Sequence, residues 1–162
     1  MEKKVVFSLL VDNEAGVLSR IAGLFSRRSY NIESLTVGET QDPSISRMTV
    51  VAGGDEDVLE QIEKQLSKLI DVREIRVLPP DSSVCRELVL MKIGVTAETR
   101  QQLIAIVDIF RAKIVDVSPD SMIVELTGTL SKIQAFTHLL GEFQVLELAR
   151  TGITGLSRGW VD

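Results

Sequence analysis

The fold is decided in the stretch VVFSLLVDNEAGVL, residues 5–18, where a strand pattern gives way to a helix pattern. Residues 5–11 form an almost continuous apolar run, which is typical of a buried β-strand. From Val17 onward, apolar residues recur at the spacing of one helix face, at Val17, Leu18, Ile21, Leu24 and Phe25. The stretch therefore predicts a strand that feeds directly into a helix through residues 12–16.

This junction also predicts a ligand site. The first N–H groups of a helix have no intrahelical acceptor, and the helix dipole is positive there. Gly16 has no Cβ, so a carboxylate could approach those N–H groups closely, and Asn13 offers both a donor and an acceptor. A zwitterion such as an amino acid suits these features. The residues alone also allow a simpler interpretation, an ordinary N-terminal helix cap beside a turn glycine.

The rest of the chain repeats one pattern twice. The first half predicts strands at 5–11, 32–39, 46–53 and 72–78 and helices at 16–28 and 55–69. The second half predicts strands at 87–95, 113–118, 121–127 and 144–150 and helices at 98–111 and 130–141. Each half is thus a βαββαβ unit, and the fold class is α+β with two tandem ferredoxin-like units. We predict an N-terminal domain over 1–78, a Pro-containing linker over 79–84 and a C-terminal domain over 85–162.

Composition limits the functions open to the chain. Its 162 residues are 44% hydrophobic and 25% charged with a net charge of −5, as in a soluble globular protein. Aromatic residues make up only 4%, which leaves few stacking platforms for nucleic acid, and no apolar run is long enough to cross a bilayer. The one cysteine, Cys85, cannot form an internal disulfide, and the one histidine, His138, cannot build a multi-histidine metal site. We therefore expect a cytoplasmic protein that binds no nucleic acid, no membrane and no structural metal.

No catalytic constellation is visible in the sequence. The chain has no Walker loop, GxSxG elbow or GxGxxG motif, and the first strand–helix loop carries Asp12 and Glu14, which would repel a phosphate. A small ferredoxin-like unit with one open sheet face is also expected to pair with a partner. We therefore predict a ligand-sensing or subunit-interaction role for a chain that forms at least a homodimer and has no catalytic residues.

Longer motifs point to a family. In the first half they are Asp12–Arg20, Gly23–Arg28, Tyr30–Val37 and Ser46–Thr49; further along they are Leu59–Leu69, Arg86–Leu88, Ile109–Arg111, Thr151-Gly152 and Gly155–Gly159. Through these motifs the chain resembles, over nearly its whole length, the small, regulatory subunit of acetolactate synthase (acetohydroxyacid synthase). The Asp/Asn-x-x-x-Gly-Val-Leu pattern by itself marks only the broader ACT class of amino-acid sensors.

The resemblance implies an N-terminal ACT domain and a C-terminal domain of related topology. It also implies a partner, the large catalytic subunit of acetolactate synthase, which uses thiamine diphosphate, magnesium and FAD to form 2-acetolactate from pyruvate. This chain would hold none of those cofactors and would not be an enzyme on its own. It would activate the large subunit and confer feedback inhibition by a branched-chain amino acid, with valine favoured over leucine and isoleucine. The alternative is a stand-alone ACT amino-acid sensor that acts on another protein.

The resemblance further implies an effector site at the interface of an ACT homodimer. One protomer would contribute Asn13, Gly16, Val17 and Leu18, and the other would contribute Asn31 and Ile32. Backbone N–H groups of residues 16–18 would then bind the ligand carboxylate. The asparagines would hold the ammonium and carboxylate, and apolar residues would receive the branched side chain.

Three residues keep a second interpretation. Ser29 stands where the family usually has glycine, and serine adopts a positive φ only with some strain. Asn31 could close the C-terminus of the first helix instead of contacting a ligand. Arg47 could be a surface charge of its strand or an interface group.

Overall fold

The structure, a computed structural model, describes residues 2–160 and divides into two compact units. The N-terminal unit contains the residues up to Cys85 together with the segment that begins at Gly152. The C-terminal unit runs from Arg86 to Thr151. Each unit is described separately below.

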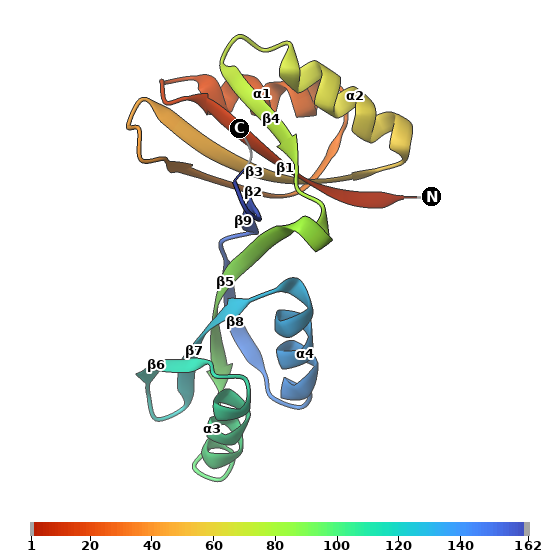
Figure 1. Cartoon of the computed structure of the whole chain (residues 1–162). Helices are drawn as coiled ribbons and strands as arrows, with labels where there is room; N and C mark the ends of the chain where they lie inside the picture. Colours follow the sequence, from red (N-terminus) through yellow and green to blue (C-terminus); the bar gives the residue numbers. More distant parts are fainter. Residues whose placement is uncertain (1, 161–162) are drawn as a thin grey trace. The chain divides into compact units, whose positions relative to one another are not determined.

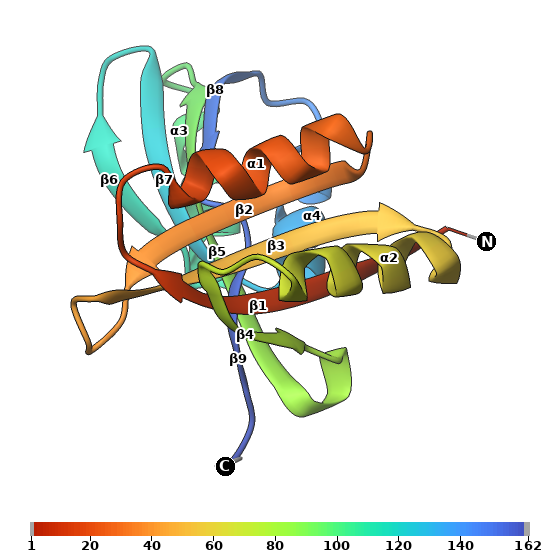
Figure 2. The ribbon, with the colours of Figure 1, turned by 90° about the horizontal axis from the view of Figure 1, so that it is seen from above.

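The N-terminal unit is an antiparallel sheet with helices on one face. Its elements are β1 (Lys3–Asp12), α1 (Val17–Arg27), β2 (Asn31–Glu39), β3 (Ile45–Gly54), α2 (Glu56–Ser67) and β4 (Val72–Val77). The strand order is β2-β3-β1-β4, and both α1 and α2 cover the same face of this sheet (Figures 1 and 2). This is the βαββαβ arrangement that the sequence predicts.

Alternation along the central strands decides which side chains meet the helices. Phe7 pairs with Val50 and Leu9 pairs with Met48 across β1 and β3, and all of these side chains are at most 1% exposed. They belong to one core with the buried faces of α1 and α2, which supply Val17, Ile21, Leu24, Phe25, Leu59, Ile62 and Leu66. The residues between them on each strand point to the other face of the sheet.

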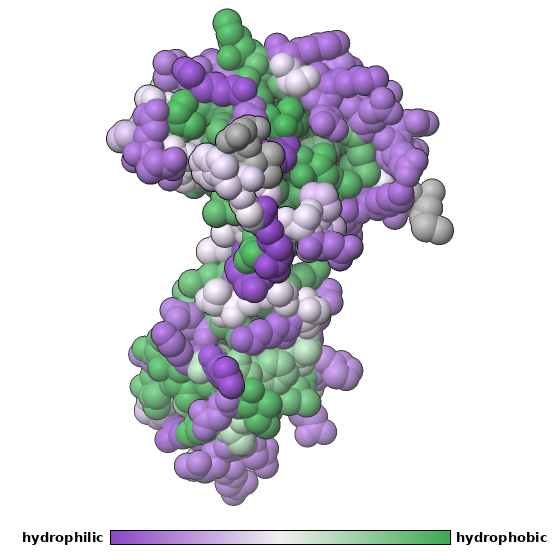
Figure 3. Space-filling view, in the orientation of Figure 1, coloured by the Kyte–Doolittle hydropathy of each residue, from purple (hydrophilic) through white to green (hydrophobic). Residues whose placement is uncertain are grey.

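The helix α2 shows how local sequence sets its ends and its orientation. The Asp55 carboxylate accepts a hydrogen bond of 2.9 Å from the Val58 backbone N–H, which caps the helix. Glu56 and Asp57 place negative charge in the first turn, where the helix dipole favours it. Polar residues cover the outer surface of this helix, the purple region at the upper right of Figure 3, because its apolar residues face the core.

The C-terminal unit repeats the arrangement. Its elements are β5 (Ser83–Gly94), α3 (Arg100–Ile109), β6 (Lys113–Val117), β7 (Ser121–Gly128), α4 (Leu130–Leu140) and β8 (Val145–Arg150), with strand order β6-β7-β5-β8. Its core includes Phe136, whose ring packs edge-on against Phe110 at 5.4 Å between ring centroids. The buried Glu87 carboxylate accepts two hydrogen bonds from Arg150, at 2.6 and 2.9 Å. The predicted α+β fold class is confirmed for both units.

The unit boundaries differ from the predicted domains at both ends of the C-terminal half. Residues 79–84, predicted as a linker, contain the 3₁₀ turn η1 (Pro80–Ser82) and the start of β5. The chain end, predicted to belong to the C-terminal domain, lies with the N-terminal unit and forms β9 (Thr154–Ser157), which pairs with β5. Periodicity could not show this, because the segment is short and its contacts are with residues far away in the sequence.

Candidate functional site

The loop that enters α1 is held in one conformation by backbone hydrogen bonds. The N–H of Asp12 donates to the Asp71 carbonyl at 2.9 Å, and the N–H of Asn13 donates to the Ser44 carbonyl at 2.8 Å. Gly16 follows with φ of 89°, in the left-handed region that favours glycine, and serves as the N-cap residue of α1. No side chain caps this helix, and Gly16 itself is its N-cap residue.

The first turn of α1 therefore presents unused donors. Val17 N–H reaches the Glu14 carbonyl at 3.4 Å and Arg20 N–H reaches the Gly16 carbonyl at 3.0 Å, whereas the N–H groups of Leu18 and Ser19 have no acceptor among residues 2–160. Unpaired N–H groups at the positive end of a helix dipole form an anion site. The geometry can hold a carboxylate at this turn.

The side chains of the turn divide into a core residue and an exposed one. Val17 is only 3% exposed and packs in the core, so the part it offers to a ligand is its backbone. Leu18 is 47% exposed and is available to a ligand or to a second protomer.

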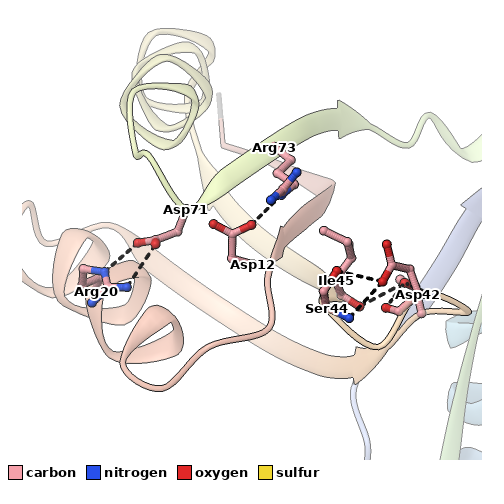
Figure 4. A network of polar contacts seen from close by, with 8 residues as sticks. Asp12, Arg20, Asp42, Ser44, Ile45, Asp71 and Arg73 are labelled. Carbon is pink, nitrogen blue, oxygen red and sulfur yellow. Dashed lines mark hydrogen bonds and ion pairs between the residues drawn. The ribbon is translucent and has the colours of Figure 1, made fainter.

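Ion pairs neutralise two of the acidic residues around the helix entrance (Figure 4). Arg20 forms two hydrogen bonds to the Asp71 carboxylate, at 2.6 and 3.0 Å, and Arg73 pairs with Asp12. The hydrogen bond from Arg20 holds the pKa of Asp71 below its ordinary value of 3.8, and the same bond raises the pKa of Arg20. A ligand carboxylate at the helix N-terminus would therefore meet little repulsion from Asp12 and Asp71.

Arg20 also lies beside Gly16. A Cβ built on Gly16 would lie 3.1 Å from Nη1 of Arg20, so the guanidinium would have to shift by a few tenths of an ångström. Arg20, Asp71 and Arg73 were not predicted as part of the site. The only local sequence signal is that Arg20 stands four residues after Gly16, one helical turn further on.

Asn13 is positioned as an acceptor. Its Nδ2 donates to the Pro43 carbonyl at 2.8 Å and to Glu39 Oε1 at 3.1 Å, which uses the donor side of the amide. No hydrogen bond to its Oδ1 comes from the described residues, so that atom remains open to the ammonium group of a ligand.

Asn31 and Ile32 lie at the opposite end of α1, at the start of β2. An α-helix of 11 residues is about 16 Å long, so one chain does not bring Asn31 near Gly16. The C-terminus of α1 is closed by the backbone N–H groups of Arg28, Ser29 and Tyr30, which donate to Leu24, Ser26 and Phe25 carbonyls. Asn31 is therefore not needed to close the helix, and its exposed amide is free of hydrogen bonds to the described residues.

Ser29 has the positive φ that the glycine of the family pattern suggests. Its φ is 54°, and its N–H donates to the Ser26 carbonyl at 3.2 Å. A serine in the left-handed region costs roughly 1–2 kcal/mol relative to a right-handed conformation. The turn before Asn31 forms in spite of this cost.

Arg47 lies on β3, away from the effector-site residues, and its Nη1 donates a hydrogen bond to Ser8 Oγ at 2.6 Å.

The described part of the chain offers no group of three or more His, Cys, Asp and Glu side chains that could hold a metal ion. No helix within residues 2–160 is long and apolar enough to span a membrane.

A βαββαβ unit with an open glycine turn at its first strand–helix junction defines the N-terminal unit as an ACT-type regulatory domain. Residues 7–74 match the family of the AHAS small subunit-like ACT domain, and residues 86–159 match the family of the small subunit of acetolactate synthase. Together these matches cover most of the chain. The chain belongs to the acetolactate synthase small subunit family.

Individual relatives match over most of their length. The probable acetolactate synthase small subunit of Methanothermobacter thermautotrophicus is 54% identical over 155 residues, which span 95% of this chain and 92% of the relative. The isozyme 3 small subunit of Escherichia coli is 48% identical, with 95% of each chain covered. The crystal structure of the small subunit from Thermotoga maritima aligns with a TM-score of 0.89 at 43% identity, covering 98% of this chain and 99% of that one.

Proposed function

We propose that this chain activates the catalytic large subunit of acetolactate synthase and makes it sensitive to feedback inhibition by a branched-chain amino acid, with valine as the favoured effector. The observation that carries the proposal is the N-terminus of α1 behind Gly16, where no side chain caps the helix. The thiamine diphosphate, magnesium and FAD of the reaction belong to the large subunit in this proposal.

Each part of the amino acid has a matching group on the chain. The carboxylate would accept hydrogen bonds from the N–H groups of Leu18 and Ser19, at the positive end of the helix dipole. The ammonium would donate to Asn13 Oδ1. Leu18, nearly half exposed, and Ile32, partly exposed, would surround the branched side chain.

The site requires two protomers, because its parts lie at opposite ends of α1. The outer edge of β2 has no neighbouring strand within the N-terminal sheet. Two copies paired about a two-fold axis along these edges would run their α1 helices antiparallel. The start of α1 in one protomer would then face Asn31 of the other, and each dimer would hold two equivalent sites.

A ligand between protomers regulates only if it binds two states of the complex with different affinity. We propose that valine favours a dimer geometry that couples less productively to the large subunit. The consequence is inhibition of the complex without any contact between valine and the reacting pyruvate.

The test is reconstitution with the large subunit. Formation of 2-acetolactate would be measured against valine concentration for the wild type, Gly16→Asp and Asn31→Ala, with Gly23→Ala as a control substitution in the same helix. We expect both site variants to lose valine inhibition and to keep activation, while Gly23→Ala keeps both. Full valine sensitivity in both site variants would show that the site assignment is wrong.

A mixing experiment tests the two-protomer arrangement directly. In a dimer of one Gly16→Asp chain and one Asn31→Ala chain, one site combines both defects and the other combines two intact halves. Random mixing should therefore restore valine binding to about one quarter of the wild-type sites, measured by calorimetry. A site built within a single chain would recover nothing.

The alternative, a stand-alone sensor, predicts a different partner. Affinity purification of the tagged chain from lysate should retain a large thiamine-dependent subunit if the proposal is right. Recovery of an unrelated protein together with an unchanged rate of acetolactate formation on reconstitution would favour the sensor.

A further inference from the structure

A row of polar side chains crosses the face of the N-terminal sheet opposite the helices. Thr36 pairs with Thr49, Thr49 pairs with Ser8, and Ser8 pairs with Arg76, so the row runs across β2, β3, β1 and β4. Thr49 and Ser8 are 0% and 3% exposed. On a bare sheet face such hydroxyls would be exposed to water, so this face is covered.

The cover is the segment of residues 152–160, here called the C-terminal strap. Thr36 Oγ1 donates to the Ile153 carbonyl at 3.3 Å, and Arg76 Nη1 donates to Ser157 Oγ at 3.1 Å. At the far end of the strap, Arg158 N–H donates to the Ser82 carbonyl at 2.7 Å. The fit is close, since a Cβ on Gly155 would lie only 2.6 Å from Cys85 Sγ.

The strap leaves a pocket of about 230 Å³ between itself and the sheet. Its walls include two arginines, Arg47 and Arg76, and the hydroxyls of Ser8 and Ser157. Leu78 and Leu156 supply the apolar part of the wall. A second pocket along β2 is also lined by Arg47. This face is distinct from the face where α1 begins.

The pocket contains more positive than negative charge. Arg76 pairs with Glu74, but Arg47 is half-buried and has no carboxylate partner among residues 2–160; its hydrogen bond goes to Ser8 Oγ at 2.6 Å. Arg20 and Arg73, in the same unit, are each paired with an aspartate. A partly buried guanidinium without a counter-charge is unfavourable unless an anion joins it.

Unused hydrogen-bonding groups also gather here. Ser8 accepts from Arg47, which leaves the Ser8 hydroxyl proton without an acceptor among the described residues. The neighbouring Thr49 hydroxyl is fully buried and has no hydrogen-bond partner within residues 2–160. Guanidinium forks and hydroxyl donors together are the groups that bind carboxylate and phosphate oxygens.

We propose that this pocket binds a small oxyanion between Arg47 and Arg76, and that the C-terminal strap closes the site through Ser157. The volume suits a ligand of a few heavy atoms. Because Leu78 and Leu156 form part of the wall, a short-chain organic carboxylate fits better than inorganic phosphate. Such a ligand needs no ammonium group, which separates this site from the amino-acid site at α1.

The test is calorimetric titration of the full chain with isobutyrate and, separately, with inorganic phosphate, at constant ionic strength. We expect saturable binding of isobutyrate, and weaker or no binding of phosphate. Arg47→Gln should reduce affinity about tenfold or more, since a charge-assisted hydrogen bond is lost, and Arg47→Lys should restore only part of it. Arg158→Gln, which removes the same charge from the strap outside the pocket wall, should bind as the wild type does.

Hydrogen exchange of the strap amides supplies a second measurement, which an unspecific charge effect would not change. Isobutyrate should slow exchange of the amides of residues 154–157 in the wild type but not in Arg47→Gln. Gly16→Asp, which disrupts the proposed amino-acid site, should still bind isobutyrate. Loss of the amino-acid site therefore leaves isobutyrate binding intact, whereas loss of this pocket abolishes it. Tighter binding of phosphate than of isobutyrate would keep the oxyanion site and overturn the carboxylate preference. Absence of saturable binding by either probe, or equal affinity in Arg47→Gln, would overturn the site itself.

Discussion

Two glycines of the N-terminal unit should respond in opposite ways to the same substitution. Gly16 has a φ of 89° at the entrance of α1, whereas Gly23 lies in the interior of the same helix with ordinary helical backbone. We predict that Gly16→Ala destabilises the protein and that Gly23→Ala stabilises it. The pair separates backbone conformation from the chemistry of the added methyl group.

The magnitudes follow from the local geometry. An alanine at Gly16 must adopt the left-handed region, at a cost of about 1–2 kcal/mol. Its Cβ would lie 3.1 Å from Nη1 of Arg20, the end of a flexible side chain that can move at small cost. At Gly23 the nearest atom to a new Cβ is Arg27 Nη1 at 3.6 Å, an ordinary contact, and alanine gains about 0.5–1 kcal/mol in a helix interior.

The assay is urea unfolding of the full chain at one protein concentration, because an oligomer's stability depends on concentration. We expect the two variants to differ by roughly 1.5–3 kcal/mol, with unchanged m-values. Calorimetry with valine should then show weakened binding for Gly16→Ala and unchanged binding for Gly23→Ala. If Gly16→Ala were as stable as the wild type, the left-handed turn would not be a requirement of the fold, and the reasoning would be refuted.

Two further predictions concern ion pairs. Since the folded-state pKa of Asp71 lies below its ordinary 3.8, its contribution to stability is fully present above that pH and is lost as the pH falls through the folded pKa. Asp71→Asn should thus be less stable at pH 7 and show a shallower loss of stability in acid, measured by urea unfolding at a series of pH values; an unchanged acid profile would argue against the pair with Arg20. In the C-terminal unit, Glu87→Gln should cost about 1–2 kcal/mol because Glu87 is buried against Arg150, while Glu147→Gln, in an exposed pair, should cost less than about 0.5 kcal/mol. Equal losses in thermal or urea unfolding would contradict the role given to burial.

Local pattern was sufficient wherever neighbouring residues decide the structure. The apolar run at 5–11 and the helical spacing from Val17 predict β1 and α1, and the repeat of this order predicts both units. The turn residues also belong to this group. Gly16 and Ser29 both have positive φ. At position 16 the glycine itself indicates this conformation, and at position 29 the glycine of the family pattern indicates it.

Contacts between distant residues were not predicted. The pairs Arg20–Asp71 and Arg73–Asp12 each join charges of a kind that exposed helices and strands commonly carry, and only the packing of β4 beside β1 brings them together. Asn31 and Gly16 are close in the sequence, yet the helix α1 between them keeps them apart within one chain.

The sequence by itself determined the tandem βαββαβ pattern, the open turn at Gly16 and the family, because these depend on local periodicity, backbone conformation and motifs. Only the tertiary structure decided that the C-terminal strap lies against the N-terminal sheet and that Arg47 lies beneath it without a carboxylate partner in the described chain. The physical reason is that the hydroxyls on this sheet face are shielded from water only when another segment of the chain packs over them. The strap has little periodicity of its own, and its position is set by the surface that it covers.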